Sequence, residues 1–237
     1  MIDLHAHILP GMDDGSRSAA ESVAMLQCLS RQGVTDVVAT PHFYAAENDP
    51  ERFLERRASA WEKLTAQLPE GLPRIHLGAE VLFFEGINGF SGLHTLCIRG
   101  TDTLLLEMPF YQWNTRMLKE LADLPQCSGL TVVLAHVERY LAFLRPEQLL
   151  LLRRSGLLFQ ANADFFCRFR TRRKALHLLQ EGLIDVLGSD CHDLADRAPR
   201  MDEAAAYITS KLGETAAHRL SAQAARLLPQ KEGAAHV

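Results

Sequence analysis

The chain has 237 residues, of which 47% are hydrophobic and 23% charged, a balance typical of a globular protein with a sizeable core. Its 25 basic and 29 acidic residues leave a net charge of −4, which argues against a general nucleic-acid-binding surface. No apolar run approaches the ~20 residues that cross a bilayer, no signal-peptide pattern opens the chain, and five scattered cysteines favour reduced thiols, so we expect a cytoplasmic protein without membrane insertion.

The first element is an apolar run of strand type at residues 1–9. It carries His5 and His7, and because a strand points side chains two positions apart to the same face, both imidazoles are expected to face one way. Ser18 and Glu21 then form a capping box, which predicts the start of a helix. Further strands are predicted at residues 36–40, 74–80, 103–107, 130–136, 157–162 and 184–190. Helices are predicted at residues 18–32, 50–68, 113–124, 146–154 and 170–180, with two Ala-rich helices after the last strand.

This alternation of strands and helices defines the expected fold class, which is α/β. Strands separated by helices of this length imply parallel βαβ units, and their nearly continuous apolar character is expected when both faces are covered. Seven such units, without a Gly-rich phosphate loop after the first strand, favour a barrel over a doubly wound sheet. No linker, internal repeat or low-complexity segment interrupts the chain, so residues 1–237 are expected to form a single domain.

Six of the seven predicted strands end in, or just before, a side chain able to bind a metal. These side chains are His5, His7, His42, Glu80, Glu107, His136, Asp190 and His192, and Asp14 in the first loop can join them. Taken singly, each is better explained as an ordinary surface or core residue. The carboxyl ends of barrel strands converge on one mouth, however, and carboxylates gathered there without cations would repel one another. The sequence therefore predicts a polynuclear site for divalent metals, with Mn, Fe and Zn all compatible with mixed nitrogen and oxygen ligands.

Hydrolysis of a phosphate ester is the chemistry expected of such a site, because clustered cations activate water at neutral pH and clamp phosphoryl oxygens. The motifs that carry these residues resemble the polymerase and histidinol phosphatase (PHP) superfamily. In chain order they are His5-Ala6-His7, Asp13-Asp14-Gly15, Thr40-Pro41-His42, Gly78-Ala79-Glu80, Ala135-His136-Val137-Glu138-Arg139-Tyr140 and Gly188-Ser189-Asp190-Cys191-His192. The Asp-Asp-Gly loop and the His-x-Glu-Arg-Tyr segment are similar, more narrowly, to bacterial protein-tyrosine phosphatases of capsule and exopolysaccharide operons. The resemblance covers residues 1 to about 200.

The resemblance implies a distorted (β/α)7 TIM-like barrel with three divalent metal ions, manganese being the expected metal. It implies three groups of ligands: His5, His7, Glu80 and Asp190; Glu80 again, with Glu107 and His136; and Asp14, His42 and His192. Arg139 and Arg197 match positions expected to contact phosphate, which a guanidinium binds through charge-assisted hydrogen bonds.

The implied substrate is phosphotyrosine in the tail of a membrane-associated bacterial tyrosine kinase that controls capsular or exopolysaccharide synthesis. A phenol with a pKa of about 10 leaves far more readily than an alcohol, so a dedicated general acid is less necessary. A metal-activated hydroxide is therefore expected to attack phosphorus in line, without a covalent enzyme intermediate.

Two segments depart from the family's pattern. Residues 163–170, after the sixth strand, do not obviously match, and the segment from Ser221 lacks an expected Asn-Pro pattern. Recognition of the substrate tail and the oligomeric state therefore stay open. The basic run Arg168–Lys174 is explained equally well as an attractor of an acidic or phosphorylated tail and as a solvated helix face.

Three other functions also stay open. A histidinol-phosphate phosphatase, or another small-molecule phosphoesterase of the superfamily, would share the metal chemistry. A cysteine-based phosphatase requires Cys-x5-Arg, which occurs from Cys167 to Arg173 and from Cys191 to Arg197, but the intervening residues are not the small ones that such a phosphate-binding loop needs. A non-catalytic module docking on a kinase or polymerase would be expected to have lost some of the metal-binding side chains.

Overall fold

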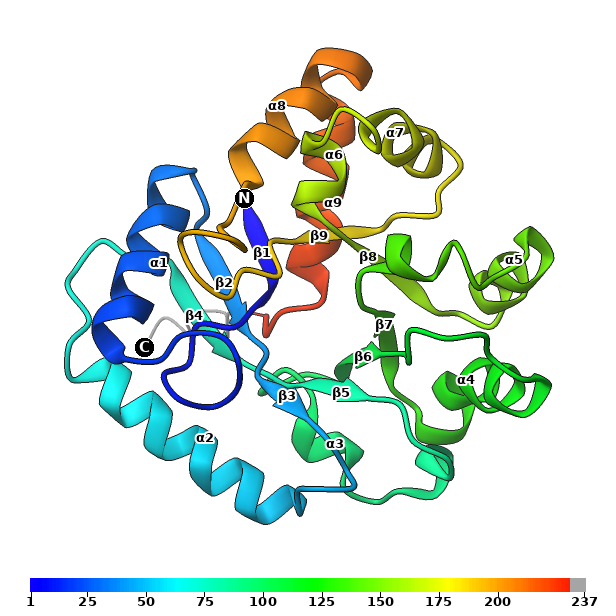
Figure 1. The fold of residues 1–237 in the computed structure, drawn as a ribbon, viewed down its shortest axis with the longest axis horizontal. Coiled ribbons are helices and arrows are strands. Elements are labelled where there is room, and N and C mark those ends of the chain that lie inside the picture. The colour runs from blue at the N-terminus through cyan, green and yellow to red at the C-terminus, as the bar shows by residue number, and fades with distance from the viewer. Residues whose placement is uncertain (231–237) are drawn as a thin grey trace, which may run out of the picture.

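A parallel sheet curls around the centre of the molecule, and the longer helices lie outside it (Figure 1). The structure is a computed structural model that describes residues 1–230. The strands are β1 (Ile2–Ala6), β2 (Asp36–Ala39), β3 (His42–Phe43), β4 (Arg74–Leu77), β5 (Glu80–Leu82), β6 (Thr103–Glu107), β7 (Thr131–Leu134), β8 (Leu158–Asn162) and β9 (Val186–Gly188). The helices are α1 (Ala19–Arg31), α2 (Pro50–Thr65), α3 (Leu93–Leu96), α4 (Thr115–Ser128), α5 (Pro146–Arg154), α6 (Ala163–Cys167), α7 (Arg172–Gln180), α8 (Met201–Leu212) and α9 (Glu214–Arg226), with 3-10 turns η1 (Ile87–Gly89) and η2 (Val137–Tyr140). The predicted α/β class with a parallel sheet is confirmed.

The curl of the sheet brings the first strand beside the last. Hydrogen bonding orders the strands as β1-β2-β4 and as β3-β5-β6-β7-β8-β9. Beyond β9, Ala6 and Cys191 form a parallel bridge, in which the His7 amide donates to the Cys191 carbonyl at 2.9 Å. The Asp190 amide donates to the His5 carbonyl at 2.8 Å. Residues near position 5 and near position 190, at opposite ends of the chain, are thereby held side by side.

The second predicted strand, at residues 36–40, is confirmed as β2, and the short β3 begins after Pro41, which has no N–H to donate to a ladder. The third predicted strand, at residues 74–80, is broken into two, so the expectation of a single strand there was wrong in this detail. The third becomes β4 and β5 around Gly78, whose carbonyl accepts a 2.6 Å hydrogen bond from Arg57 of α2. His42 and Glu80 are the first residues of β3 and β5, so each lies at the start of a new short strand.

The ends of the helices follow local capping. Ser18 caps α1, as predicted, by accepting a 3.2 Å hydrogen bond from the Glu21 amide. Helix α4 differs from its predicted range: it begins after Asn114, which caps it, and it runs past Pro125 to Ser128, where Gly129 ends it in the left-handed conformation. Among residues 1–230, no helix is both long and apolar enough to span a membrane.

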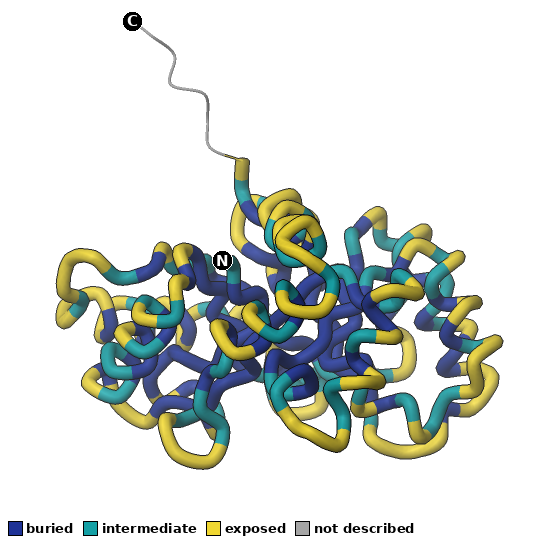
Figure 2. Tube along the Cα trace, turned by 90° about the horizontal axis from the view of Figure 1, so that it is seen from above, coloured by how far each residue is buried: buried dark blue, intermediate teal, exposed yellow. Residues whose placement is uncertain are grey.

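The C-terminal helix covers the amino ends of the strands. A small apolar cluster joins Leu105, Val133 and Val186 of the sheet to Leu227, just after α9. The Thr103 hydroxyl at the start of β6 donates to the Leu227 carbonyl at 3.1 Å. The centre of the molecule is buried, whereas many of the outer turns are exposed (Figure 2). One end of the curled sheet is thus closed by apolar packing, which leaves the carboxyl ends of the strands for the site.

Candidate metal centre

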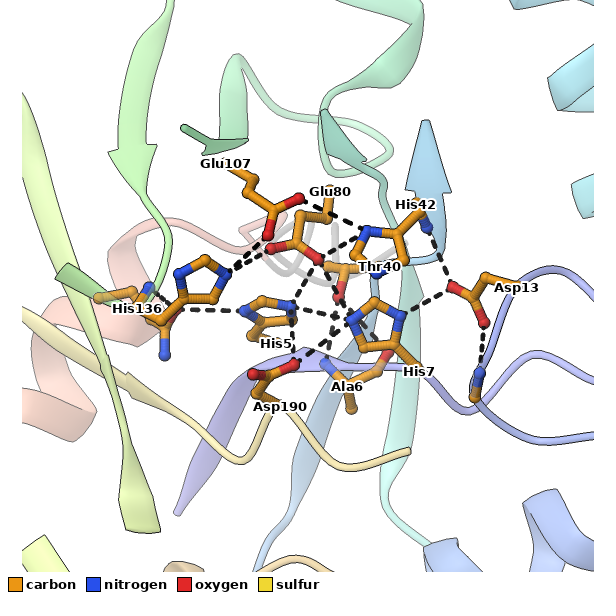
Figure 3. Close-up of polar contacts among 12 residues, drawn as sticks. His5, Ala6, His7, Asp13, Thr40, His42, Glu80, Glu107, His136 and Asp190 are labelled. Carbon is orange, nitrogen blue, oxygen red and sulfur yellow. Dashed lines mark hydrogen bonds and ion pairs between the residues drawn. The ribbon is translucent and has the colours of Figure 1, made fainter. Parts of the chain in front are cut away.

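The nine predicted metal-binding side chains lie in one continuous cluster at the carboxyl ends of the strands. Figure 3 labels those of His5, His7, His42, Glu80, Glu107, His136 and Asp190. At its centre, His5 Nε2 and His7 Nε2 lie 3.0 Å apart, on the same face of the chain as predicted. Glu80 Oε2 lies 3.1 Å and 3.3 Å from these two nitrogens, and Asp190 Oδ1 lies 3.6 Å from each. Two imidazoles and two carboxylates therefore aim their ligand atoms at a single point.

The second part of the cluster is built around the other oxygen of Glu80. Its Oε1 lies 2.9 Å from His136 Nε2, which is also 3.4 Å from Glu107 Oε1. Glu107 Oε2 reaches to 3.9 Å from His42 Nδ1. Each oxygen of Glu80 thus faces a different group of side chains, which is the arrangement of a carboxylate that bridges two cations.

The third part of the cluster lies toward the first loop. Asp14 Oδ1 is 3.3 Å from His192 Nε2 and 3.5 Å from His42 Nε2. Ligand atoms within 4.8 Å of one another define three groups: His7, Asp14, His42 and His192; His5, His7 and Asp190; and His42, Glu80 and Glu107. The membership of these groups overlaps the division implied by the family resemblance, but His7 and His42 each belong to two of them.

The chemistry of the donor set fits divalent cations. Within residues 1–230, the buried atoms His42 Nδ1, Glu80 Oε2 and His192 Nε2 have no hydrogen-bond partner, although all face other ligand atoms. Burial alone lowers the pKa of His7, yet the carboxylates of Asp13 and Glu80 raise it to about 10. Burial likewise lowers the pKa of His136, and Glu107 and Glu80 raise it to about 9. Buried carboxylates are stabilised by positive charge beside them, which bound cations would supply without protonation of the imidazoles.

Three side chains that the sequence analysis did not assign to the site hold the imidazoles and a carboxylate in position. His7 Nδ1 lies 2.7 Å from Asp13 Oδ2, and because a carboxylate only accepts, Nδ1 carries the proton and Nε2 is free to bind a metal. Gln160 Oε1 lies 3.2 Å from His5 Nδ1 and accepts from the His136 amide at 2.7 Å. Asn162 Nδ2 donates to Asp190 Oδ2 at 2.7 Å. Asp13 lies in the Asp13-Asp14-Gly15 motif, and Gln160 and Asn162 lie on the strand predicted at residues 157–162. No spacing in the sequence distinguishes an orienting partner from an ordinary loop or strand residue.

The backbone is strained at two of the candidate ligands. His136 and Asp190, at φ +31° and +52°, are the non-glycine residues with positive φ within residues 1–230. Residues other than glycine rarely adopt this backbone conformation, and it persists only where the surrounding structure stabilises it. His136 and Asp190 each lie two residues past the end of a strand, β7 and β9, in turns from which their side chains enter the cluster.

Arg139 and Arg197 lie at the edge of the cluster, and both form ion pairs with the carboxylate of Asp190. Arg139 Nη2 lies 2.5 Å from Asp190 Oδ2, and Arg197 Nη2 lies 2.8 Å from Asp190 Oδ1. The loop that carries Arg197 is held by Asp193 Oδ1, which accepts from the amides of three residues after it. Both arginines line a cavity of about 480 Å³, here called the mouth, together with Asp14, His42, Glu80, Glu107, Phe110 and Tyr111.

Neither cysteine of the Cys-x5-Arg spacings is placed to act as a nucleophile. Burial raises the pKa of the Cys191 thiol well above its usual range, and Cys191 is fully buried beside β1, where it bridges to Ala6. Burial also raises the pKa of Cys167 to about 11. Within residues 1–230, all five cysteines are free thiols, as predicted.

Gly188 lies so close to His5 that its position has no space for a side chain. A Cβ there would lie 2.5 Å from His5 Cβ and 2.9 Å from Gln160 Nε2. We expect Gly188→Ala to displace His5, to lower the metal content and to destabilise the fold by about 1–3 kcal/mol, the usual cost of overpacking. Thermal unfolding and elemental analysis measure both effects. Gly89→Ala is the matched control, because a Cβ there meets no described atom within 4 Å, and equal behaviour of the two variants would contradict the prediction.

The fold and the site together define a class: parallel α/β proteins whose strand ends carry a cluster of imidazoles and carboxylates fit for several divalent cations. The family described as capsular polysaccharide synthesis, CpsB/CapC, matches residues 1–228. The tyrosine-protein phosphatase YwqE of Bacillus subtilis (strain 168) is 30% identical over 237 residues, covering 96% of this chain and 91% of that protein. The chain belongs to the CpsB/CapC family.

Two further comparisons agree with this assignment. The tyrosine-protein phosphatase CpsB of Streptococcus pneumoniae is 28% identical over 236 residues, covering 93% of this chain and 94% of that protein. A solved structure with 26% identity superposes with a TM-score of 0.84 over 97% of this chain and 95% of that chain. It is reported among crystal structures of YwqE from Bacillus subtilis and CpsB from Streptococcus pneumoniae, described as unique metal-dependent tyrosine phosphatases.

Proposed function

We propose that this chain is a metal-dependent protein-tyrosine phosphatase. The observation that carries the proposal is the meeting of nine imidazole and carboxylate side chains from seven separate segments at one end of the sheet. The names of the relatives, tyrosine-protein phosphatases in both cases, support the same activity. Residues 1–237 are proposed to act as one domain, and the fold as a distorted (β/α)7 barrel, which is supported by the bridge between Ala6 and Cys191.

The proposed cofactors are three divalent cations, with manganese as the expected metal. Glu80 would face two of them. The other side chains proposed to hold the ions are His5, His7, Asp14, His42, Glu107, His136, Asp190 and His192. Bound cations would supply an activated water molecule at neutral pH and a clamp on the phosphoryl oxygens. Asp13 and Gln160 hold the ring nitrogens of His7 and His5 toward the centre, so that little rearrangement is needed on binding.

Arg139 and Arg197 are proposed to bind the phosphoryl group of the substrate. Their guanidinium groups lie on either side of Asp190, and each side chain is 36% exposed toward the mouth. A guanidinium offers several donors in a plane and pairs well with phosphate oxygens. The two arginines would therefore orient the phosphate with one of its faces toward the cluster and would offset charge that builds up during hydrolysis.

Aromatic side chains at the mouth favour an aryl phosphate as the substrate. Phe110 and Tyr111 are 49% and 58% exposed, although large apolar side chains are usually buried, and both line the mouth with Tyr44. Phe110 lies near His136, with ring centroids 5.7 Å apart, and stacks on Tyr140 at 5.8 Å. A phenol ring can pack against such a wall, whereas the small polar imidazole of histidinol phosphate gains less from it. The proposed substrate is phosphotyrosine in a protein tail.

The biological setting is proposed from the family. Its description as capsular polysaccharide synthesis supports a substrate that takes part in capsular or exopolysaccharide production. We propose the phosphorylated tail of a membrane-associated bacterial tyrosine kinase as that substrate. A cytoplasmic location is supported by the five free thiols among the described residues, since disulfides are rare in that compartment.

Elemental analysis combined with turnover of a phosphotyrosyl peptide, before and after chelation, tests the proposed function. We expect close to three ions per chain, loss of turnover on chelation, and the best recovery with manganese. Cys191→Ser is expected to keep its activity, because the thiol takes no part in the reaction. Active protein with zero or one ion would contradict the proposal, and faster turnover of histidinol phosphate than of the peptide would favour the small-molecule phosphoesterase instead.

A further inference from the structure

A second hollow opens directly beside the mouth. It has a volume of about 400 Å³ and is lined by Arg139, Asp164, Arg168, Asp190, Arg197 and Arg200, among others. We call it the flanking hollow. Arg139, Asp190 and Arg197 line both spaces, so the two meet at the residues proposed to hold the phosphate. A peptide whose phosphotyrosine occupies the mouth has its neighbouring residues within reach of this space.

The charge of the flanking hollow is positive once the metal centre is filled. Four arginines line it, against the carboxylates of Asp164, Asp190 and Asp196. Asp190 lies 3.6 Å from His5 Nε2 and His7 Nε2 in the candidate metal centre, where bound cations would offset its charge. The remaining two carboxylates are outnumbered by the guanidinium groups, and further basic residues follow at the start of α7. Arg168 directly follows α6 and Arg200 directly precedes α8, and because these two helices pack against each other, both charges are held at the ends of packed helices.

Arg168 and Arg200 form the far wall of the flanking hollow, away from the mouth, and they differ in how freely they can bind a ligand. Arg200 already lies 2.8 Å from Asp164 Oδ1 and 2.6 Å from Glu203 Oε2, so its guanidinium is occupied within the protein. Arg168 forms an ion pair with Asp164 through Nε, and its side chain is 67% exposed. Asp164 thus joins both arginines and fixes the direction of Arg168. The guanidinium of Arg168 is the group of the far wall best placed to receive an anion.

We propose that the flanking hollow is a subsite for a second negatively charged group of the substrate, a carboxylate or a phosphate, carried by a residue near the phosphotyrosine. This inference rests on the proposed phosphatase activity. Arg168 binds the second anion, and Arg139 and Arg197 stay with the phosphoryl group that is hydrolysed. The subsite gives the enzyme a preference for acidic or multiply phosphorylated segments without adding a group to the chemical step.

Steady-state kinetics on three matched phosphotyrosyl peptides test the subsite. The peptides differ at flanking positions only: one carries glutamines, one glutamates, and one phosphoserine as a second phosphate. For the unmodified enzyme we expect kcat/KM to be about 3- to 10-fold higher for both anionic peptides than for the glutamine peptide, mainly through KM, in keeping with one partly exposed charge pair. The glutamate and phosphoserine arms show which anion is preferred, and a preference for either one supports the subsite.

Arg168→Gln is expected to reduce this preference to near unity, while turnover of the glutamine peptide and of a small aryl phosphate stays unchanged. Arg168→Lys should restore part of it. The matched control is Arg173→Gln, because Arg173 belongs to the same basic run and is exposed but does not line the flanking hollow. Equal rates on all three peptides, or equal losses in Arg168→Gln and Arg173→Gln, would overturn the subsite. Failure of the proposed function looks different, since no phosphotyrosyl peptide would then be hydrolysed.

Discussion

Replacing Glu80 by glutamine is expected to remove most of the activity and to lower the metal content of the purified protein. Glu80 is 1% exposed and presents one oxygen to His5, His7 and His42 and the other to His136. An amide keeps the shape of the side chain but loses the charge and half of the acceptor capacity. We expect kcat/KM to fall more than about 100-fold, since even the outer partners of metal ligands cost about 10- to 100-fold when removed.

The measurement pairs elemental analysis with turnover of a phosphotyrosyl peptide at saturating manganese. Glu85→Gln is the matched control, because Glu85 is five residues further along the chain and its side chain is 61% exposed, paired only with the exposed Arg116 among the described residues. This variant should keep both its ions and its activity. A Glu80→Gln enzyme that retains the full metal content and full turnover would show that the centre does not depend on a bridging carboxylate.

The strand ends explain why much of the site could be predicted from the sequence. His5, Glu107 and His136 each lie at or next to the carboxyl end of an apolar run, and parallel strands bring such ends to one edge. The alternation of side chains also placed His5 and His7 on one face correctly. Local pattern was sufficient for His5 and Glu107 because the strand that carries each sets its direction, whereas His136 lies past β7 in a turn at φ +31°.

Other features depend on contacts between distant parts of the chain. At the break between β4 and β5, the Gly78 carbonyl accepts a hydrogen bond from Arg57, which lies more than twenty residues earlier in the chain. The orientation of His5 depends on Gln160 of β8, 155 residues away. No periodicity in the sequence reports such a pair, so residues that orient ligands were missed while the ligands themselves were found.

The C-terminal end of α4 was also predicted incorrectly, although by only a few residues. The helix predicted at residues 113–124 ends just before Pro125, and proline disturbs a helix interior. The helix continues to Ser128, since the lost hydrogen bond lies in its last turn and Gly129, at φ +73°, donates to the Pro125 carbonyl at 3.0 Å. The capping glycine outweighed the proline, and the sequence contained both signals.

Replacing either of the two arginines of the mouth, Arg139 or Arg197, is expected to weaken phosphate binding while leaving the metal content unchanged. For Arg139→Met and Arg197→Met we expect kcat/KM to fall about 10- to 100-fold each, the range that corresponds to ~1.5–3 kcal/mol for a hydrogen bond to a charged group. The inhibition constant for inorganic phosphate should rise by a similar factor in each variant. Lysine at either position should restore only part of the loss, because an ammonium cannot form the paired bonds of a guanidinium.

The structure supplies a rival explanation that the same variants test. Both guanidiniums contact Asp190, at 2.5 Å and 2.8 Å, so each arginine could act only by holding this carboxylate in place. If they act on the phosphate, the metal content of both variants stays at the level of the unmodified protein while phosphate inhibition weakens. If they act only through Asp190, ions and activity are lost together and the affinity of the remaining active enzyme for phosphate is unchanged. Arg116→Met, whose side chain is 71% exposed and paired with Glu85, controls for the loss of one surface charge and should change neither quantity.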